Sequence, residues 1–102
     1  MVKDYKPILK ELYAEILKLE TEEECENFFS DLCTMKELLS MSQRLKAAKM
    51  LLEGKKYNQV IEETDISSAT LARVSKCIQY GEGGYANIIK KEKIQYSIYL
   101  PY

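Results

Sequence analysis

Residues 57–80 constrain the fold more than any other part of this chain. Their sequence is YNQVIEETDISSATLARVSKCIQY, and its apolar and small residues recur at helical spacing on both sides of a short break at residues 65–67. The side chains expected to face inward are Val60, Ile61, Thr64, Leu71, Val74 and Ile78. Ile66 would fill the corner between the two segments. The pattern predicts two short helices packed across a tight turn.

Two positions depart from the usual helix-turn-helix pattern. Asp65 stands where the turn usually has glycine, and aspartate enters the left-handed conformation more readily than most residues do. Ile61 stands where many such motifs have alanine. Neither departure breaks the pattern, so we predict a helix-turn-helix over residues 57–80. The alternative is an ordinary helical hairpin whose basic face is only solvated.

The outward face of the second helix combines small side chains with long cationic ones. Small side chains let a helix backbone approach the major groove, and Arg73 and Lys76 can reach phosphate or a guanine edge. We also expect Lys55 and Lys56 to contact the DNA backbone. The predicted partner is therefore double-stranded DNA. The expected DNA-binding residues are Ser68, Ala69, Thr70, Ala72, Arg73, Lys76, Lys55 and Lys56.

The net charge of −1 conceals a strongly uneven charge distribution. Residues 1–40 contain ten acidic side chains and five lysines, which is a balance of −5. Residues 41–102 contain six acidic and ten basic side chains, which is a balance of +4. The half with the helix-turn-helix therefore carries the positive field that attracts phosphate.

Several classes of protein are disfavoured by the composition. The chain has no histidine, which removes the common nucleophile systems and imidazole metal sites, and no paired acids or phosphate-binding glycine loop appear. We therefore expect no enzyme, no metal and no cofactor. Cys25, Cys33 and Cys77 lack CxxC spacing and are interpreted as reduced core thiols. No run approaches the ~18 apolar residues of a membrane span, so we expect a cytoplasmic protein without membrane contact.

The rest of the sequence predicts further helices. Thr21 with Glu24, and Thr34 with Glu37, have the spacing of capping boxes, and Ser40 with Gln43 offers a third that would begin a separate helix ending near Gly54. Gly81, Gly83 and Gly84 would end the second helix of the motif, and residues 85–91 would form one more short helix.

The apolar stripes of residues 1–39 are wide for helices that cover one small domain. They favour packing on a second copy, although packing on this chain's own core is the alternative. The tail, residues 94–102, alternates like a strand but has no strand to pair with. It is interpreted as an arm laid on the helical body, with a two-stranded ribbon across a dimer or a disordered end as alternatives.

The helix order, the segment MSQRLKAAKMLLEG and the sequence SATLARV together resemble the Trp repressor superfamily, and more closely its YerC/YecD-like branch. The resemblance covers about residues 28–90. It implies an all-α, multi-helix Trp-repressor-like fold over residues 1–93, built as an intertwined homodimer that presents two recognition helices about one DNA turn apart. We expect residues 94–102 to form a C-terminal arm or tail that follows this domain.

The resemblance further implies an effector pocket. Thr34, Arg44 and Arg73 match a pocket-wall threonine and the two arginines that flank the tryptophan ligand. However, Val74 stands where the tryptophan repressor has glycine, and Cys77 where it has serine, so the space for an indole is reduced. A small-molecule corepressor is conceivable, but tryptophan is not expected. The alternative roles for the two arginines are a solvated or ion-paired residue and a phosphate contact.

The function predicted from the sequence is that of a sequence-specific transcriptional regulator, a repressor, whose helix-turn-helix binds the major groove without needing tryptophan. The alternative is a helix-turn-helix interaction module or a transposase-type accessory protein. Duplex binding that depends on salt would distinguish the two.

Overall fold

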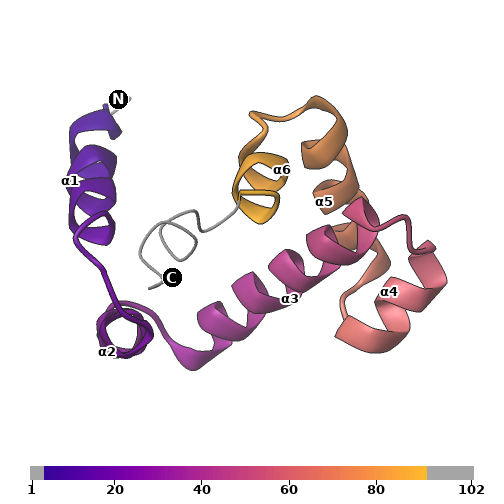
Figure 1. Ribbon diagram of the computed structural model, residues 1–102, viewed down its shortest axis with the longest axis horizontal. Helices are drawn as coiled ribbons and strands as arrows, with labels where there is room; N and C mark the ends of the chain where they lie inside the picture. The colour runs from indigo at the N-terminus through magenta and orange to yellow at the C-terminus, as the bar shows by residue number, and fades with distance from the viewer. Residues whose placement is uncertain (1–3, 92–102) are drawn as a thin grey trace, which may run out of the picture. The chain divides into compact units, whose positions relative to one another are not determined.

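The computed structural model describes residues 4–91, which form helices joined by short connections (Figure 1). No strand occurs in this described range, so the all-α prediction is confirmed. The tail at residues 94–102 lies outside it. The helices are α1 (Lys6–Ile16), α2 (Glu22–Leu32), α3 (Met35–Leu52), α4 (Tyr57–Thr64), α5 (Ser68–Tyr80) and α6 (Gly84–Ile89).

The chain divides into two compact units, with the boundary between Leu38 and Leu39. Each unit is described by itself below. The extent of the predicted single domain, residues 1–93, stays a prediction.

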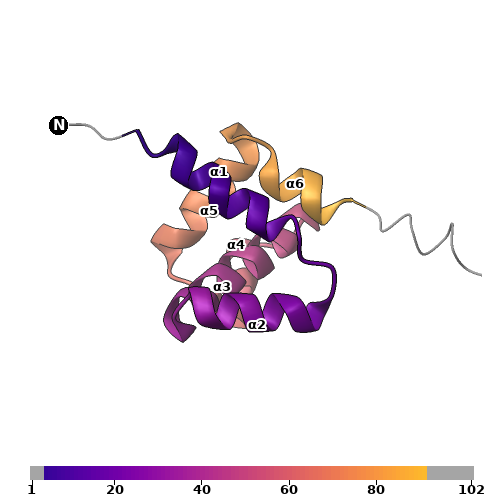
Figure 2. The same cartoon turned by 90° about the vertical axis from the view of Figure 1, so that its left-hand side faces the viewer.

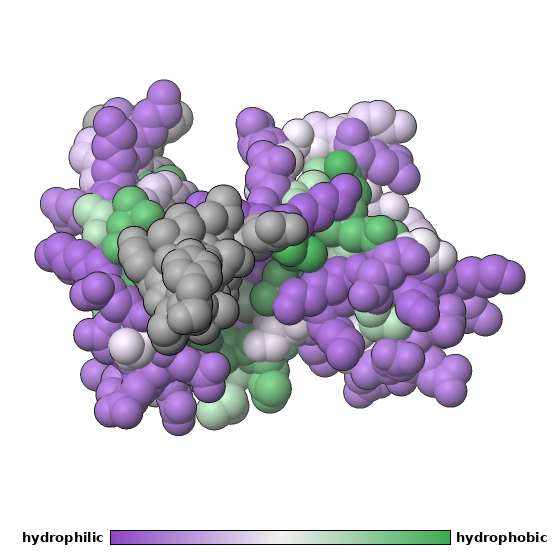
Figure 3. Space-filling model, viewed as in Figure 1, coloured by the Kyte–Doolittle hydropathy of each residue, from purple (hydrophilic) through white to green (hydrophobic). Residues whose placement is uncertain are grey.

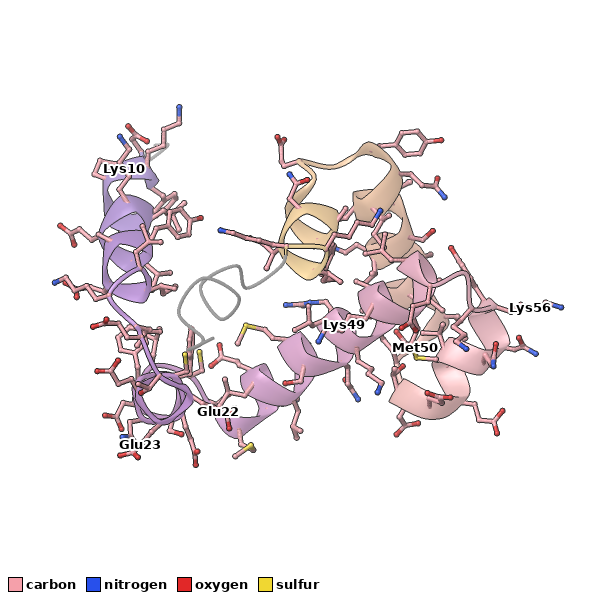
Figure 4. The ribbon with its side chains drawn as sticks, in the orientation of Figure 1. Lys10, Glu22, Glu23, Lys49, Met50 and Lys56 are labelled. Carbon is pink, nitrogen blue, oxygen red and sulfur yellow. The ribbon has the colours of Figure 1, made fainter. Side chains whose placement is uncertain are left out.

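The first unit contains α1 and α2, and α2 begins at a well-formed cap. The Thr21 hydroxyl accepts a hydrogen bond of 3.0 Å from the backbone N–H of Glu24, and the Glu24 carboxylate accepts one of 2.8 Å from the N–H of Glu20. The predicted capping box is confirmed, with its return bond shifted by one residue. Glu22 and Glu23 project from the same turn (Figure 4), where negative charge stabilises the amino end of a helix.

Neither α1 nor α2 contains a buried residue. Several of their apolar side chains are largely in solvent, up to 58% exposed for Ile8, whereas Leu12, Ile16, Phe28 and Phe29 are half-buried. Apolar surface on this scale is usually covered by a partner in a folded protein. Within residues 4–38, the exposed large apolar side chains are Tyr5, Ile8, Leu9, Tyr13, Leu17, Leu32 and Met35.

The helix α3 begins at the second predicted capping box. The Glu37 carboxylate accepts a 2.8 Å hydrogen bond from the Thr34 N–H, and the Thr34 hydroxyl accepts one of 3.1 Å from the Glu37 N–H. The bond from the Thr34 N–H, and after it a bond of 3.1 Å that the Thr34 hydroxyl donates to the same carboxylate, hold the pKa of Glu37 below its ordinary value of 4.5.

The predicted helix start at Ser40 is wrong, because α3 continues through it without a break. Instead of closing a capping box, the Gln43 side chain donates a 3.2 Å hydrogen bond to the carbonyl of Thr64 at the end of α4. This bond joins α3 to the helix-turn-helix. The predicted stop is correct: Gly54 has φ 87°, and the next N–H, of Lys55, donates to the Met50 carbonyl at 3.0 Å.

The core of the second unit joins the second half of α3 to α4 and α5. Ala47 and Ala48 of α3 are fully buried, and their small side chains allow close helix packing. α6 lies beside α5 in both ribbon views (Figures 1 and 2), and the two helices are in contact. The buried apolar side chains are Ala47, Ala48, Met50, Val60, Ile66, Leu71 and Val74, with Leu51, Ile61, Ile78, Tyr85 and Ile89 packed against them. The predicted inner face of the motif is thus confirmed.

Candidate nucleic-acid interface

The turn between α4 and α5 is held by backbone geometry and side-chain hydrogen bonds. Asp65 adopts the left-handed conformation, with φ 60° and ψ 20°, as its sequence position predicted. The buried Thr64 hydroxyl donates to the Val60 carbonyl at 2.7 Å and accepts from the Ile66 N–H at 3.3 Å. Ser67 then caps α5, because its hydroxyl accepts from the Thr70 N–H at 3.1 Å. The direction of α5 is therefore set by the turn itself.

The exposed face of α5 carries most of the residues predicted to bind DNA. Ser68, Ala69, Ala72, Arg73 and Lys76 are all exposed. The last four of them line one shallow hollow of about 380 Å³. Its lining thus combines two small side chains with two cationic ones.

Thr70 is an exception among the predicted residues. It is half-buried, and its hydroxyl is hydrogen-bonded to the Ser67 hydroxyl at 2.9 Å. This contact assigns Thr70 a part in the cap of α5.

Lys55 and Lys56 lie at the start of α4 and are both exposed. Figure 4 shows the Lys56 side chain extending away from the helix, and Figure 3 shows that the surface over α4 is mostly hydrophilic. Residues 39–91 contain nine basic and five acidic side chains, so the described part of this unit is cationic. Within residues 4–91 the ion pair is Lys18 with Glu15, in the first unit, so Lys55, Lys56 and the cations of α5 are available to another molecule.

A second hollow, of about 280 Å³, contains four of the five residues predicted for the effector pocket. Its lining residues are Arg44, Arg73, Val74, Cys77 and Tyr85. We call it the arginine pocket. It has no acidic lining residue, and Val74 is only 1% exposed because it belongs to the core.

Thr34 is not among the residues that line the arginine pocket, and its hydroxyl serves the cap of α3. Its predicted place in an effector site stays a prediction. Tyr85 was missed by sequence reasoning, since it lies outside the helix-turn-helix and beyond a glycine-rich turn. The sequence indicated only that Tyr85 would begin the short helix predicted at residues 85–91.

The interpretation of the cysteines as core thiols is wrong. All three are free, but Cys77 is exposed and Cys25 and Cys33 are only half-buried. Cys77 lies beside the buried stripe of α5 and faces the open arginine pocket, which explains its exposure. Among the described residues, no group of three His, Cys, Asp or Glu side chains could hold a metal ion. None of the helices in residues 4–91 has the length and apolar character needed to cross a membrane.

The fold and this surface define a helix-turn-helix protein, with a capped second helix whose outer face is small and cationic. The family model described as Trp repressor protein matches residues 8–93, and the chain belongs to that family.

Individual relatives agree with this assignment. The chain is 44% identical over 85 residues to YerC of Bacillus subtilis strain 168, a protein described as uncharacterized, and the match covers 83% of this chain and 82% of YerC. A crystal structure of a candidate Trp repressor from Staphylococcus aureus is similar, with a TM-score of 0.78, 40% identity and coverage of 86% of this chain and 92% of that one. A TrpR-like protein from Eubacterium eligens ATCC 27750 has a TM-score of 0.79, 35% identity and coverage of 96% and 97%.

Proposed function

We propose that this protein is a sequence-specific DNA-binding transcriptional regulator, and that its recognition helix is α5. The observation that carries the proposal is the exposed hollow of Ala69, Ala72, Arg73 and Lys76 on a helix with a fixed direction. Its small side chains admit a base edge closely, and its two cations reach guanine or phosphate. Membership of the Trp repressor family supports this proposal.

The proposed DNA contacts fall into two groups. Ser68, Ala69, Ala72, Arg73 and Lys76 face the major groove, whereas Lys55 and Lys56 contact the phosphate backbone. Thr70 supports the helix start and contributes indirectly. Because the groove-facing side chains are mostly short, direct base contacts are few, and readout through water and DNA shape contributes.

The proposal includes a homodimer. The apolar faces of α1 and α2 have no buried residue within their own chain, and a second copy would cover them. Each large apolar side chain that becomes fully buried contributes about 1.5–3 kcal/mol, so even partial cover of several of them is substantial. Sedimentation at low micromolar concentration should show only a dimer. A compact, folded monomer throughout that range contradicts the dimer model.

We further propose that DNA binding does not require tryptophan. Val74 fills its site in the core, and a bound indole would have to displace this packed side chain. The cost of that overlap exceeds what one partly solvated ion pair returns. Calorimetric titration with L-tryptophan should therefore show no saturable heat at micromolar levels. Binding that also tightens the affinity for DNA contradicts this part of the proposal.

We infer that the protein represses transcription, because the family is described as Trp repressor protein. We infer a cytoplasmic location because the protein is proposed to bind DNA and its thiols are free.

Selection of DNA fragments by the purified full chain from a random pool tests the function. We expect one enriched, palindromic site, since a symmetric dimer presents two equivalent recognition helices. No enrichment, and no binding of duplex that depends on salt, would instead favour an interaction module.

A further inference from the structure

Arg73 borders three hollows. One is the hollow of the proposed groove-facing surface, which it shares with Ala69, Ala72 and Lys76. A second, near the end of α5, is also shared with Lys76. The third is the arginine pocket, which it shares with Arg44 and Tyr85. The long side chain of Arg73 can therefore extend toward Lys76 or into the arginine pocket, and only the first direction places the guanidinium where the proposed DNA would lie.

The arginine pocket disfavours a second guanidinium. Arg44 of α3 already contributes one, and no carboxylate lines the pocket to neutralise either charge. Within residues 4–91 neither arginine has an ion pair or a hydrogen bond from its side chain. Two like charges that approach each other at a partly desolvated surface repel more strongly than they do in water. Repulsion from Arg44 therefore disfavours an Arg73 guanidinium that is turned into the pocket.

Tyr85 supplies the remaining wall of the arginine pocket. It is half-buried in the first turn of α6 and packs against the core. Its hydroxyl has no hydrogen-bond partner in the described structure, so the volume of the ring is the property that acts on the pocket.

The turn before α6 brings this helix back beside α5 (Figures 1 and 2). At Gly81, an added Cβ would lie 2.4 Å from the Cys77 carbonyl oxygen, which only glycine avoids. Gly83 is left-handed, with φ 80°, and its carbonyl accepts from the Asn87 N–H at 2.9 Å. The backbone at Gly81 and Gly83 thus fixes the turn that precedes Tyr85.

We propose that Tyr85 is a positioning residue for DNA recognition: its ring closes the pocket side of Arg73 and so directs the guanidinium toward the groove-facing hollow. This inference rests on the proposed function. It assigns α6, which lies outside the helix-turn-helix, a role in base recognition. It also predicts that Tyr85 acts on DNA affinity through Arg73 and through no other residue.

A double-mutant cycle on the full chain tests this dependence. The wild type, Tyr85→Ala, Arg73→Ala and the double variant are titrated with the selected duplex at one fixed salt concentration. We expect Tyr85→Ala alone to weaken binding by about 3- to 10-fold, a coupling within the range observed for neighbouring residues. In the Arg73→Ala background the same change should have an effect below about 1.5-fold, since the side chain that it positions is gone.

Three further variants separate positioning from folding. Tyr85→Phe keeps the ring and should bind within about 2-fold of the wild type, because the hydroxyl has no partner. Tyr85→Leu keeps apolar packing and replaces Tyr85→Ala if that variant does not fold. It should weaken the sequence preference at a single base pair of the selected site. Ile88→Ala is the matched control on the same helix: Ile88 is 67% exposed and does not line the pocket, so binding should not change.

Equal losses for the Tyr85 change in both backgrounds would overturn the inference, as would a loss in Tyr85→Phe as large as that in Tyr85→Ala. Either result leaves the proposed function intact, because the wild type still binds the duplex. If the wild type binds no duplex, the proposed function is wrong and this inference falls with it.

Discussion

The substitution Val74→Ala examines the residue on which the proposed independence from tryptophan rests. Val74 is 1% exposed and belongs to the core that joins α3, α4 and α5. The change removes two buried methyl carbons, which contribute about 0.8 kcal/mol each by transfer from water. A residual cavity adds to this loss, so we expect the free energy of unfolding to fall by about 2–3 kcal/mol.

Thermal unfolding followed by far-ultraviolet circular dichroism measures this effect, at one protein concentration because a dimer's melting temperature depends on it. For a chain of this size, about 1 kcal/mol corresponds to roughly 4–8 °C, so the melting temperature should fall by more than about 8 °C. Cys77→Ala is the control, since Cys77 is exposed on the same helix and should change stability by less than about 0.5 kcal/mol. If Val74→Ala melts within error of the wild type, Val74 does not hold α5 in place, and the case against a ligand-dependent helix fails.

Asp65→Val should lower stability by about 1–2 kcal/mol because a branched side chain is strained at φ 60°, whereas Asp65→Asn should stay close to the wild type in chemical denaturation. The bond from Thr34 lowers the pKa of Glu37, so the stability from this cap is fully present above pH 4.5 and is lost as the pH falls through the lowered pKa. Nuclear magnetic resonance titration should show the lowered pKa of Glu37, and Glu37→Gln should abolish the pH dependence of this cap. If a thymine methyl group packs into the hollow of Ala69 and Ala72, replacing thymine by uracil at one position of each half-site should weaken binding, and equal affinity at every position would argue against that contact.

Local rules were enough to predict much of the fold. Features that act within a few residues of their own position can be predicted from the sequence. They include the capping residues Thr21 and Thr34, the left-handed Asp65 and the helix end at Gly54. The inner face of the helix-turn-helix follows from helical spacing in the same way. Ser40 was misread because its expected partner, Gln43, bonds to Thr64, which lies far along the chain.

The arginine pocket was predicted only in part, for a related reason. Arg44, Arg73, Val74 and Cys77 were assigned to it through the family resemblance, and the structure brings those four together. Tyr85 reaches the pocket through the turn at Gly81 and Gly83, and no spacing rule connects it to α5. The stripes of α1 and α2 correctly predicted helices, but periodicity does not say which surface an apolar face will cover.

Titration of the selected duplex with the Arg73→Ala and Lys76→Ala variants, at fixed salt and then over a range of salt concentrations, shows whether the exposed face of α5 binds DNA. We expect each variant to fold normally. A variant whose side chain contacts a base should lose about 1–3 kcal/mol of binding free energy. A variant whose side chain contacts a phosphate should reduce the slope of the logarithm of the binding constant against the logarithm of the salt concentration by about one unit. Lys10→Ala, which removes an exposed lysine of α1, is the control and should bind like the wild type. If both α5 variants also match the wild type in affinity and salt dependence, the exposed face of α5 is not the surface that binds DNA.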